Sequence, residues 1–161
     1  MIISATMSDI ASIQQIARFT WFETYGAILS AEQINYMLDL IYSTKSLEEQ
    51  MKNGHQFFLL QQNGERIGFI DIEKTSETRT KLHKIYLLPN QQAKGYGKLL
   101  INLAVEKAGK QGSSILQLNV NRYNNAIEFY KKSGFRIVEE TDIPIGNGYF
   151  MNDYVMEKIL S

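Results

Sequence analysis

Hydrophobic positions in the first third of the chain recur every three or four residues, which is the spacing of amphipathic helices. This pattern predicts one helix over residues 9–21 and a second that opens with the capping-box sequence SAEQ at residues 30–33. A third, shorter helix is expected to begin at Ser46 and to stop before Gly54. The apolar run at residues 2–5 predicts a short strand ahead of the first helix.

The rest of the chain mixes strand-like and helix-like patterns. The dipeptide Asn63-Gly64 is the strongest short hairpin signal and separates two apolar runs. Pro89 ends a further strand, and Gly134 is a typical helix terminator. The predicted strands are residues 56–61, 66–74, 81–88, 114–120, 135–142 and 149–159, and the predicted helices between them are residues 96–112 and 124–133.

This order of elements predicts a single α/β domain over residues 1–161. Consecutive strands favour hairpins, whereas the two strand–helix–strand passages favour parallel pairs. The expected fold is therefore a mixed central sheet with helices on both faces. A length of 161 residues suits one domain, and no linker, repeat or low-complexity tract interrupts the chain.

Composition narrows the kind of protein and its partners. Seventeen basic residues balance seventeen acidic ones without a basic stripe, so no nucleic-acid partner is expected. The chain has no cysteine, which excludes disulfides, thiolate metal sites and a cysteine nucleophile, and we predict no metal site. No apolar run is long enough for a signal peptide or a membrane span. We expect a soluble, cytoplasmic protein with no membrane partner.

The most informative stretch is the loop between the strand that ends at Pro89 and the helix that begins near Tyr96. The first N–H groups of a helix lack partners and lie at the positive end of its dipole. Gly95 and Gly97 leave these groups open to an anion, which is typical of a phosphate or pyrophosphate seat. The two glycines also fit a plain tight turn, and this alternative stays open at this point.

Two common nucleotide motifs do not fit this loop. The dinucleotide fingerprint requires a third glycine where Leu100 stands. The nucleotide-triphosphate loop requires a glycine at Gln92 and a serine or threonine at Leu99. A nucleotide-binding domain is therefore disfavoured.

Two longer motifs carry a family resemblance. Residues 82–89 (LHKIYLLP), followed by Gln92 and the glycines at 95 and 97, resemble the coenzyme A-binding motif of the GNAT superfamily of N-acetyltransferases. Residues 124–135 (NNAIEFYKKSGF) resemble the second signature of that family. The predicted order of elements is similar to the GNAT fold, in which two parallel strands splay apart. The composition around Tyr25 and over residues 30–37 looks similar to the branch that acetylates polyamines and other small amines.

The resemblance implies that acetyl-coenzyme A is the cosubstrate. Backbone N–H groups of residues 92–98 would hold its pyrophosphate, and residues 85–87 would pair with the pantetheine arm as an added strand. The N–H group near Leu87 would face the thioester oxygen. Asn121 or Asn124 would contact the arm. The implied cofactor-binding residues are Ile85, Tyr86, Leu87, Gln92, Ala93, Lys94, Gly95, Tyr96, Gly97, Lys98, Asn121, Asn124 and Tyr130.

The resemblance further implies that a primary amine attacks the thioester directly in a ternary complex. Tyr130 would act as general acid toward the departing thiolate. A base is also needed, because a primary amine is protonated at neutral pH. His83 and Glu73 are the candidates, and a water chain would also serve. His83 has a suitable intrinsic pKa, and strand alternation predicts that it shares a face with Ile85 and Leu87.

The acceptor is expected to be a small-molecule or peptide primary amine. Trp21, Glu23 and Tyr25 are the predicted substrate residues, because the helices around them cover the acceptor site in this family. Glu23 would attract a cationic amine. The alternative is a non-catalytic acyl-coenzyme A sensor or partner-binding module on the same fold, although Tyr130 favours an enzyme. A homodimer would be supported by an exposed strand at residues 149–159.

Overall fold

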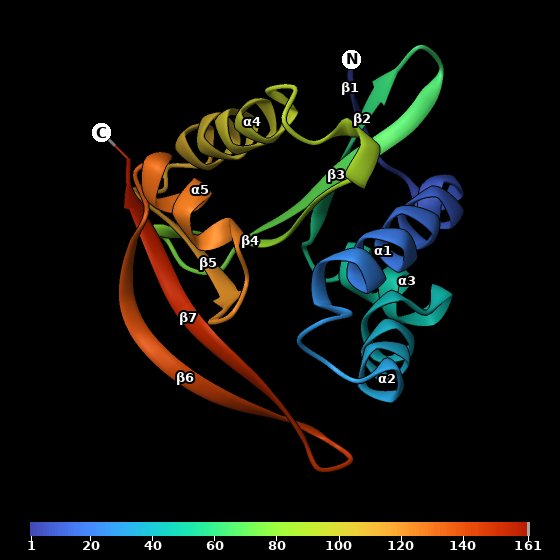
Figure 1. Cartoon of the computed structure of the whole chain (residues 1–161). Helices are drawn as coiled ribbons and strands as arrows, with labels where there is room; N and C mark the ends of the chain where they lie inside the picture. Colours follow the sequence, from blue (N-terminus) through green and yellow to red (C-terminus); the bar gives the residue numbers. More distant parts are fainter. Residues whose placement is uncertain (161) are drawn as a thin grey trace.

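The computed structural model describes residues 1–160 as one sheet flanked by helices (Figure 1). Within this range the strands are β1 (Ile2–Ser4), β2 (Gln56–Gln62), β3 (Glu65–Lys74), β4 (Arg79–Leu87), β5 (Ile115–Asn121), β6 (Arg136–Gly146) and β7 (Tyr149–Ile159). The helices are α1 (Ile10–Tyr25), α2 (Ala31–Tyr42), α3 (Thr44–Lys52), α4 (Tyr96–Lys110) and α5 (Ala126–Lys132). Short 3-10 helices precede α1 and follow β4, at Met7–Asp9 and Pro89–Gln91. Every predicted helix and strand is confirmed, and the strand at 149–159 has the predicted bounds, whereas other elements have shifted ends.

Local contacts explain where two helix ends differ from the prediction. Helix α1 continues to Tyr25 because Trp21 and Tyr25 lie one turn apart on its buried face. Helix α3 begins at Thr44 rather than Ser46, because the Ser43 hydroxyl caps it and accepts a hydrogen bond from the Ser46 N–H at 3.2 Å.

The strands lie in the order β1-β2-β3-β4-β5-β7-β6 across the sheet. Among the strands of residues 1–160, only β4 and β5 are parallel neighbours, and the other neighbouring strands are antiparallel. Of the two expected parallel pairs, the one across α4 is confirmed. The pair across α5 is wrong, because β7 lies between β5 and β6.

The C-terminal strand lies inside the sheet and not at its edge. β7 carries the buried residues Asp153, Val155 and Met156, whereas β6 has no buried residue. A tight turn with positive φ at residues 146–148 folds β7 back on β6. Burial of apolar side chains then favours the inner place for β7. The expectation of an exposed strand at 149–159, on which a homodimer was based, is therefore wrong.

Each face of the sheet carries a hydrophobic core, so helices cover both faces as predicted. One core lies under α4 and α5 and includes Leu82, Leu100 and Leu118. The other lies under α1, α2 and α3 and includes Ile13 and Phe69. No helix within residues 1–160 is both long and apolar enough to cross a membrane.

Candidate active site

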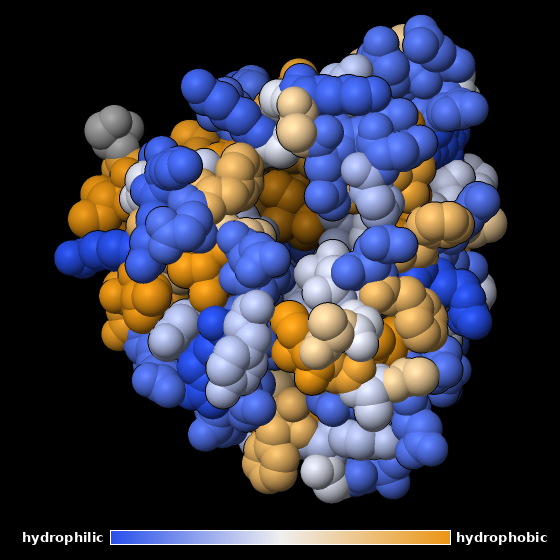
Figure 2. All heavy atoms as spheres, viewed as in Figure 1, coloured by the Kyte–Doolittle hydropathy of each residue, from blue (hydrophilic) through white to orange (hydrophobic). Residues whose placement is uncertain are grey.

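The parallel pair β4–β5 opens into a gap. Arg79–Leu82 pair with Ile115–Leu118, and the two strands do not pair further within the part of the chain that the structure describes. β4 nevertheless continues to Leu87 and stays paired with β3. Residues 83–87 therefore direct backbone groups into the gap, which confirms the predicted splay. Figure 2 shows a recess in this region, with hydrophobic atoms at its floor.

A row of free backbone donors follows β4 at the start of α4. Ala93 and Gly95 have positive φ values of 63° and 86°. The N–H groups of residues 93–98 have no hydrogen-bond acceptor among residues 1–160, and the first donor with one is Leu99, which bonds to the Gly95 carbonyl at 3.2 Å. Consecutive free N–H groups at a helix N-terminus favour an anion. This geometry suits the predicted pyrophosphate seat.

Side chains along the same loop brace it or reach solvent. The Gln92 amide donates to the Leu87 carbonyl at 3.3 Å and ties the loop to the end of β4. Tyr96 packs against the core beneath α4. Lys94 and Lys98 are exposed, and a groove of about 470 Å3 runs beside Lys98. Two cations therefore accompany the free donors.

The two glycines of the loop have different roles. Gly95 has a positive φ, and a Cβ added there would meet no atom within 4 Å. A Cβ on Gly97 would lie 3.2 Å from Cζ of Phe129 on α5. Gly95 thus serves the backbone conformation of the loop, whereas Gly97 lets α5 pack against the first turn of α4. The second role was not predicted.

Tyrosines from three elements converge beside the gap: Tyr25 from α1, Tyr86 from β4 and Tyr130 from α5. Burial raises the pKa of Tyr25 to about 12 and raises the pKa values of Tyr86 and Tyr130 above the usual 10.0. Tyr25 adds to both of these further shifts, so the three hydroxyls lie near one another. All three are protonated at neutral pH. Tyr130 therefore carries its hydroxyl proton, and its role as general acid stays a prediction.

Both candidate asparagines shape the turn between β5 and α5. Oδ1 of Asn121 accepts from the Tyr123 N–H at 2.9 Å, and Oδ1 of Asn124 accepts from the Ala126 N–H at 2.8 Å. Asn124 also lies close to the Tyr25 hydroxyl, where it opposes the burial-driven rise in the Tyr25 pKa. The structure therefore brings Asn124 to the tyrosines, whereas Asn121 is buried at the end of β5.

The predicted substrate residues separate into two groups. The Trp21 ring lies 4.7 Å from Tyr25, 6.3 Å from Tyr42 and 6.4 Å from Tyr86, measured between centroids. This aromatic cluster packs α1 onto β4 at the gap. Glu23 is exposed, because two residues correspond to about 200° of rotation around a helix. The structure therefore does not bring Glu23 to the same face as Trp21 and Tyr25.

A bulge in β4 changes which of its residues share a face. The register with β3 skips His83, which is the extra residue of the bulge. Ile85 and Leu87 pack against the core under α4. The ring of His83 instead stacks on His55, and His55 stacks on Phe57 of the opposite core. The prediction that His83 shares a face with Ile85 and Leu87 is wrong, because a bulge interrupts the alternation of a strand.

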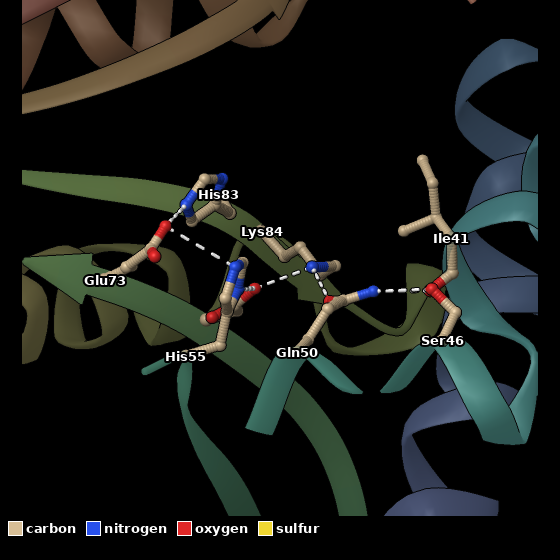
Figure 3. Close-up of polar contacts among 8 residues, drawn as sticks. Ile41, Ser46, Gln50, His55, Glu73, His83 and Lys84 are labelled. Atoms are coloured by element: carbon tan, nitrogen blue, oxygen red, sulfur yellow. Dashed lines mark hydrogen bonds and ion pairs between the residues drawn. The ribbon is translucent and has the colours of Figure 1, made fainter. Parts of the chain in front are cut away.

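His83 is one end of a polar network that crosses β3 toward α3 (Figure 3). His83 Nε2 lies 2.8 Å from Glu73 Oε1. Oδ2 of the buried Asp71 lies 2.7 Å from His55 Nδ1 and 2.6 Å from Lys84 Nζ. Burial lowers the pKa of His83, although the Asp71 charge and the Glu73 hydrogen bond oppose this shift. The structure joins His83 to Glu73, and their role as proton acceptor stays a prediction. His55 was not among the predicted residues.

The β6–β7 hairpin is bonded to α2 at the end of the gap away from α4 (Figure 1). The Tyr36 hydroxyl donates to the Ile145 carbonyl at 2.8 Å, and the Gln33 amide donates to the Phe150 carbonyl at 3.1 Å. The rings of Tyr36 and Tyr149 lie 5.4 Å apart. These contacts hold the hairpin beside α2, so the gap has a defined border on this side.

Asp153 on β7 is a buried carboxylate near the tyrosines that the sequence did not reveal. Its Oδ1 has no hydrogen-bond partner within residues 1–160, and its Oδ2 accepts a long bond of 3.4 Å from Asn119. Burial raises the pKa of Asp153, while Asn119 and the charges of Lys81 and Arg122 oppose the shift. Its charge also raises the pKa of Tyr25. Asp153 therefore places negative potential at the gap.

The sequence of the chain is similar to those of known acetyltransferases. Residues 27–157 match the family model described as an acetyltransferase (GNAT) domain. The chain is 30% identical over 159 residues to the spermidine N(1)-acetyltransferase of Thermoplasma acidophilum, covering 95% of this chain and 92% of that protein. It is 34% identical over 78 residues to the ribosomal protein bS18-alanine N-acetyltransferase of Haemophilus influenzae, covering 48% and 53%.

Solved structures are similar as well. The PaiA N-acetyltransferase of Thermoplasma acidophilum in complex with coenzyme A matches with a TM-score of 0.85 and 27% sequence identity, over 99% of this chain and 98% of that chain. The ribosomal-protein-S18-alanine N-acetyltransferase of Escherichia coli matches with a TM-score of 0.76 at 20% identity. At that lower identity the likeness concerns the fold.

Proposed function

Because the chain belongs to the GNAT acetyltransferase family, we propose that it transfers an acetyl group from acetyl-coenzyme A to a primary amine. The observation that carries this proposal is the gap beyond Leu82 beside the free N–H groups of residues 93–98. The gap suits an extended arm with amide groups, and the free N–H groups suit a diphosphate. Acetyl-coenzyme A contains such an arm and a diphosphate. The similar PaiA structure, which is a complex with coenzyme A, supports the same ligand here.

The cosubstrate would lie along β4 with its diphosphate on the start of α4. The backbone of residues 85–87 pairs with the pantetheine arm, and the N–H groups of residues 93–98 hold the diphosphate. Lys94 and Lys98 add positive charge beside the phosphates. The thioester oxygen then faces the backbone N–H near Leu87, which stabilises the negative charge of the tetrahedral intermediate.

Direct transfer requires one bond to form and one to break. The neutral amine nitrogen attacks the thioester carbonyl carbon, and collapse of the intermediate breaks the carbon–sulfur bond. Tyr130 donates its hydroxyl proton to the departing thiolate. The nitrogen releases its surplus proton to water, and a proton returns through water to Tyr130. Burial keeps the pKa of Tyr130 high, so the residue starts each cycle protonated.

The acceptor we propose is a small aliphatic amine of the polyamine class. The name of the Thermoplasma relative, a spermidine N(1)-acetyltransferase, supports this class because the similarity spans 95% of this chain. The bS18-alanine relative covers only 48% and supports a peptide acceptor less. Trp21 and Tyr25 belong to the buried aromatic cluster beside the gap, and in this proposal that cluster forms the wall of the acceptor site.

Two measurements test the proposal. Calorimetry with acetyl-coenzyme A, and with ATP as control, tests the binding site, and release of free thiol over a panel of amines tests the transfer. Tyr130→Phe should bind acetyl-coenzyme A as tightly as the unmodified chain and lose at least about 100-fold in kcat. The matched control Tyr123→Phe alters an exposed tyrosine of the same region and should change neither.

The outcomes separate the competing functions. Absence of heat with acetyl-coenzyme A on folded protein would refute the cosubstrate site and the enzyme together. Binding without thiol release from any amine would instead favour the non-catalytic sensor on the same fold. Unchanged kcat in Tyr130→Phe would refute the acid role alone.

A further inference from the structure

Three side chains, one just before β2 and one each from β3 and β4, direct their ligand atoms toward one another (Figure 3). His55 lies just before β2, Glu73 near the end of β3 and His83 on the bulge of β4. One donor atom from each lies within 4.8 Å of the other two. Oε1 of Glu73 is 2.8 Å from His83 Nε2 and 3.5 Å from His55 Nε2. We propose that this cluster binds a divalent transition-metal ion, with Zn2+ as the best match to its ligands.

The tautomer of His55 follows from its other nitrogen. Nδ1 lies 2.7 Å from Oδ2 of Asp71, and the ammonium of Lys84 donates to the same oxygen at 2.6 Å. The oxygen is therefore an acceptor, and Nδ1 carries the hydrogen. A neutral ring then has its lone pair on Nε2, which faces the Glu73 carboxylate. Two lone pairs at 3.5 Å repel unless a positive charge lies between them. A metal ion or an additional proton would supply that charge.

The ligand types and their support favour the metal ion. Two imidazoles and one carboxylate are a common set for Zn2+, with a fourth position left for water. A carboxylate that orients the second nitrogen of a ligating histidine, as Asp71 does for His55, is the usual second contact in such sites. Asp71 is fully buried, and Lys84 is fixed by Gln50 at 2.6 Å. The orientation of His55 is thus set before any ion binds.

The cluster is also reachable. The side chains of His55, Glu73 and His83 are 16%, 26% and 22% exposed. A groove of about 420 Å3, lined by His55, Met51 and Phe57 among others, opens beside the cluster. An ion can therefore enter without rearrangement of the core. Once bound, it links the start of β2 with β3 and β4, so we expect it to stabilise this part of the sheet.

Direct metal titration tests this inference independently of the proposed function. The chain has two histidines and no cysteine, so protein without a histidine tag has no other imidazole or thiolate ligand. Chelator-treated protein should bind one equivalent of Zn2+ by calorimetry and show a raised unfolding temperature with Zn2+. Co2+ should give the visible d–d absorption of a low-coordinate site with nitrogen ligands.

Variants assign the ligands. His55→Gln, His83→Gln and Glu73→Gln should each weaken Zn2+ binding at least about 100-fold, and Asp71→Asn about 10- to 100-fold. Glu77→Gln, in the exposed turn between β3 and β4, should bind as the unmodified chain does. Circular dichroism in chelator shows whether each variant folds. If Asp71→Asn does not fold, His83→Gln still tests the site, because the His83 side chain is 22% exposed and carries no part of the buried core.

Equal Zn2+ affinity in the unmodified chain and in folded His83→Gln would overturn the inference. So would a Co2+ complex without d–d intensity above that of the free ion. The cluster would then hold a shared proton only. Since acetyl-coenzyme A binding is measured separately, failure of the metal site leaves the proposed function standing, and the reverse also holds.

Discussion

Replacing Gly97 with alanine tests whether the packing of α5 against the start of α4 excludes a side chain at position 97. The new Cβ would lie 3.2 Å from Cζ and 3.5 Å from Cε1 of Phe129. Alanine is favoured over glycine within a helix by about 1 kcal/mol. Overpacking of a filled contact costs about 1–3 kcal/mol. We therefore expect Gly97→Ala to lower the free energy of unfolding by about 0–2 kcal/mol, and this loss should depend on the Phe129 ring.

Gly95→Ala provides the contrast, because its cost has another cause. The residue has φ of 86° and open space around its Cα. A left-handed conformation costs an L-residue about 1–2 kcal/mol. This loss should not depend on Phe129. Combined with Phe129→Leu, Gly97→Ala should show a coupling energy of about 1 kcal/mol, whereas Gly95→Ala should show almost none.

Urea unfolding of the single and double variants measures these energies, and the fluorescence of Trp21, the only tryptophan, reports the transition. Equal slopes of free energy against urea are required for the comparison. If Phe129→Leu couples equally to both glycine variants, the steric explanation for Gly97 is wrong. If it couples to neither, the contact between α4 and α5 does not restrict the size of the side chain at position 97.

Three further predictions concern stability. Asp153→Asn should raise the free energy of unfolding at neutral pH, because burial raises the folded-state pKa of Asp153 above the ordinary 3.8. Urea unfolding at several pH values should show that this gain shrinks as the pH falls through the raised pKa. Lys84→Met should cost about 3–5 kcal/mol in urea unfolding, because it leaves the buried Asp71 without its cation, and a loss below about 1 kcal/mol would contradict this reasoning. Ser30→Ala should lower the free energy of unfolding, measured by thermal unfolding, by about 1 kcal/mol, because the Ser30 hydroxyl caps α2 by accepting a hydrogen bond from the Gln33 N–H at 3.1 Å. An aspartate at the same position, Ser30→Asp, should keep most of this stability.

Local signals were sufficient to predict the elements and the free N–H groups at the start of α4. Helix periodicity, the capping sequence at residues 30–33 and the hairpin dipeptide at 63–64 all act over a few residues, and each predicted element is present. The free N–H groups of residues 93–98 follow from the start of a helix after a short loop, which is also a local property. These features needed no knowledge of distant contacts.

Strand order and side-chain faces depend on partners that are distant in the sequence. The inner place of β7 follows from which strand of the last hairpin carries the buried residues. The bulge at His83 arises in the register between β3 and β4, so alternation within one strand did not reveal it. His55 meets Glu73 and His83 only through the pairing of β2, β3 and β4. Asp153 approaches Tyr25 only because β7 folds back beside β5.

Residues 83–87 of β4 form an unpaired strand edge in the middle of a sheet, and unpaired edges that are open to solvent promote aggregation by recruiting strands from other chains. Here the edge is recessed between α4 and β5, where a thin ligand can enter more readily than a polypeptide strand with side chains on both faces. One outer edge of the sheet, β6, is protected differently, by the charges of Glu139, Glu140 and Asp142 and by Pro144, which has no N–H to donate. The recessed edge of β4 and the charged edge of β6 are thus both poorly suited to pairing with a strand from another chain.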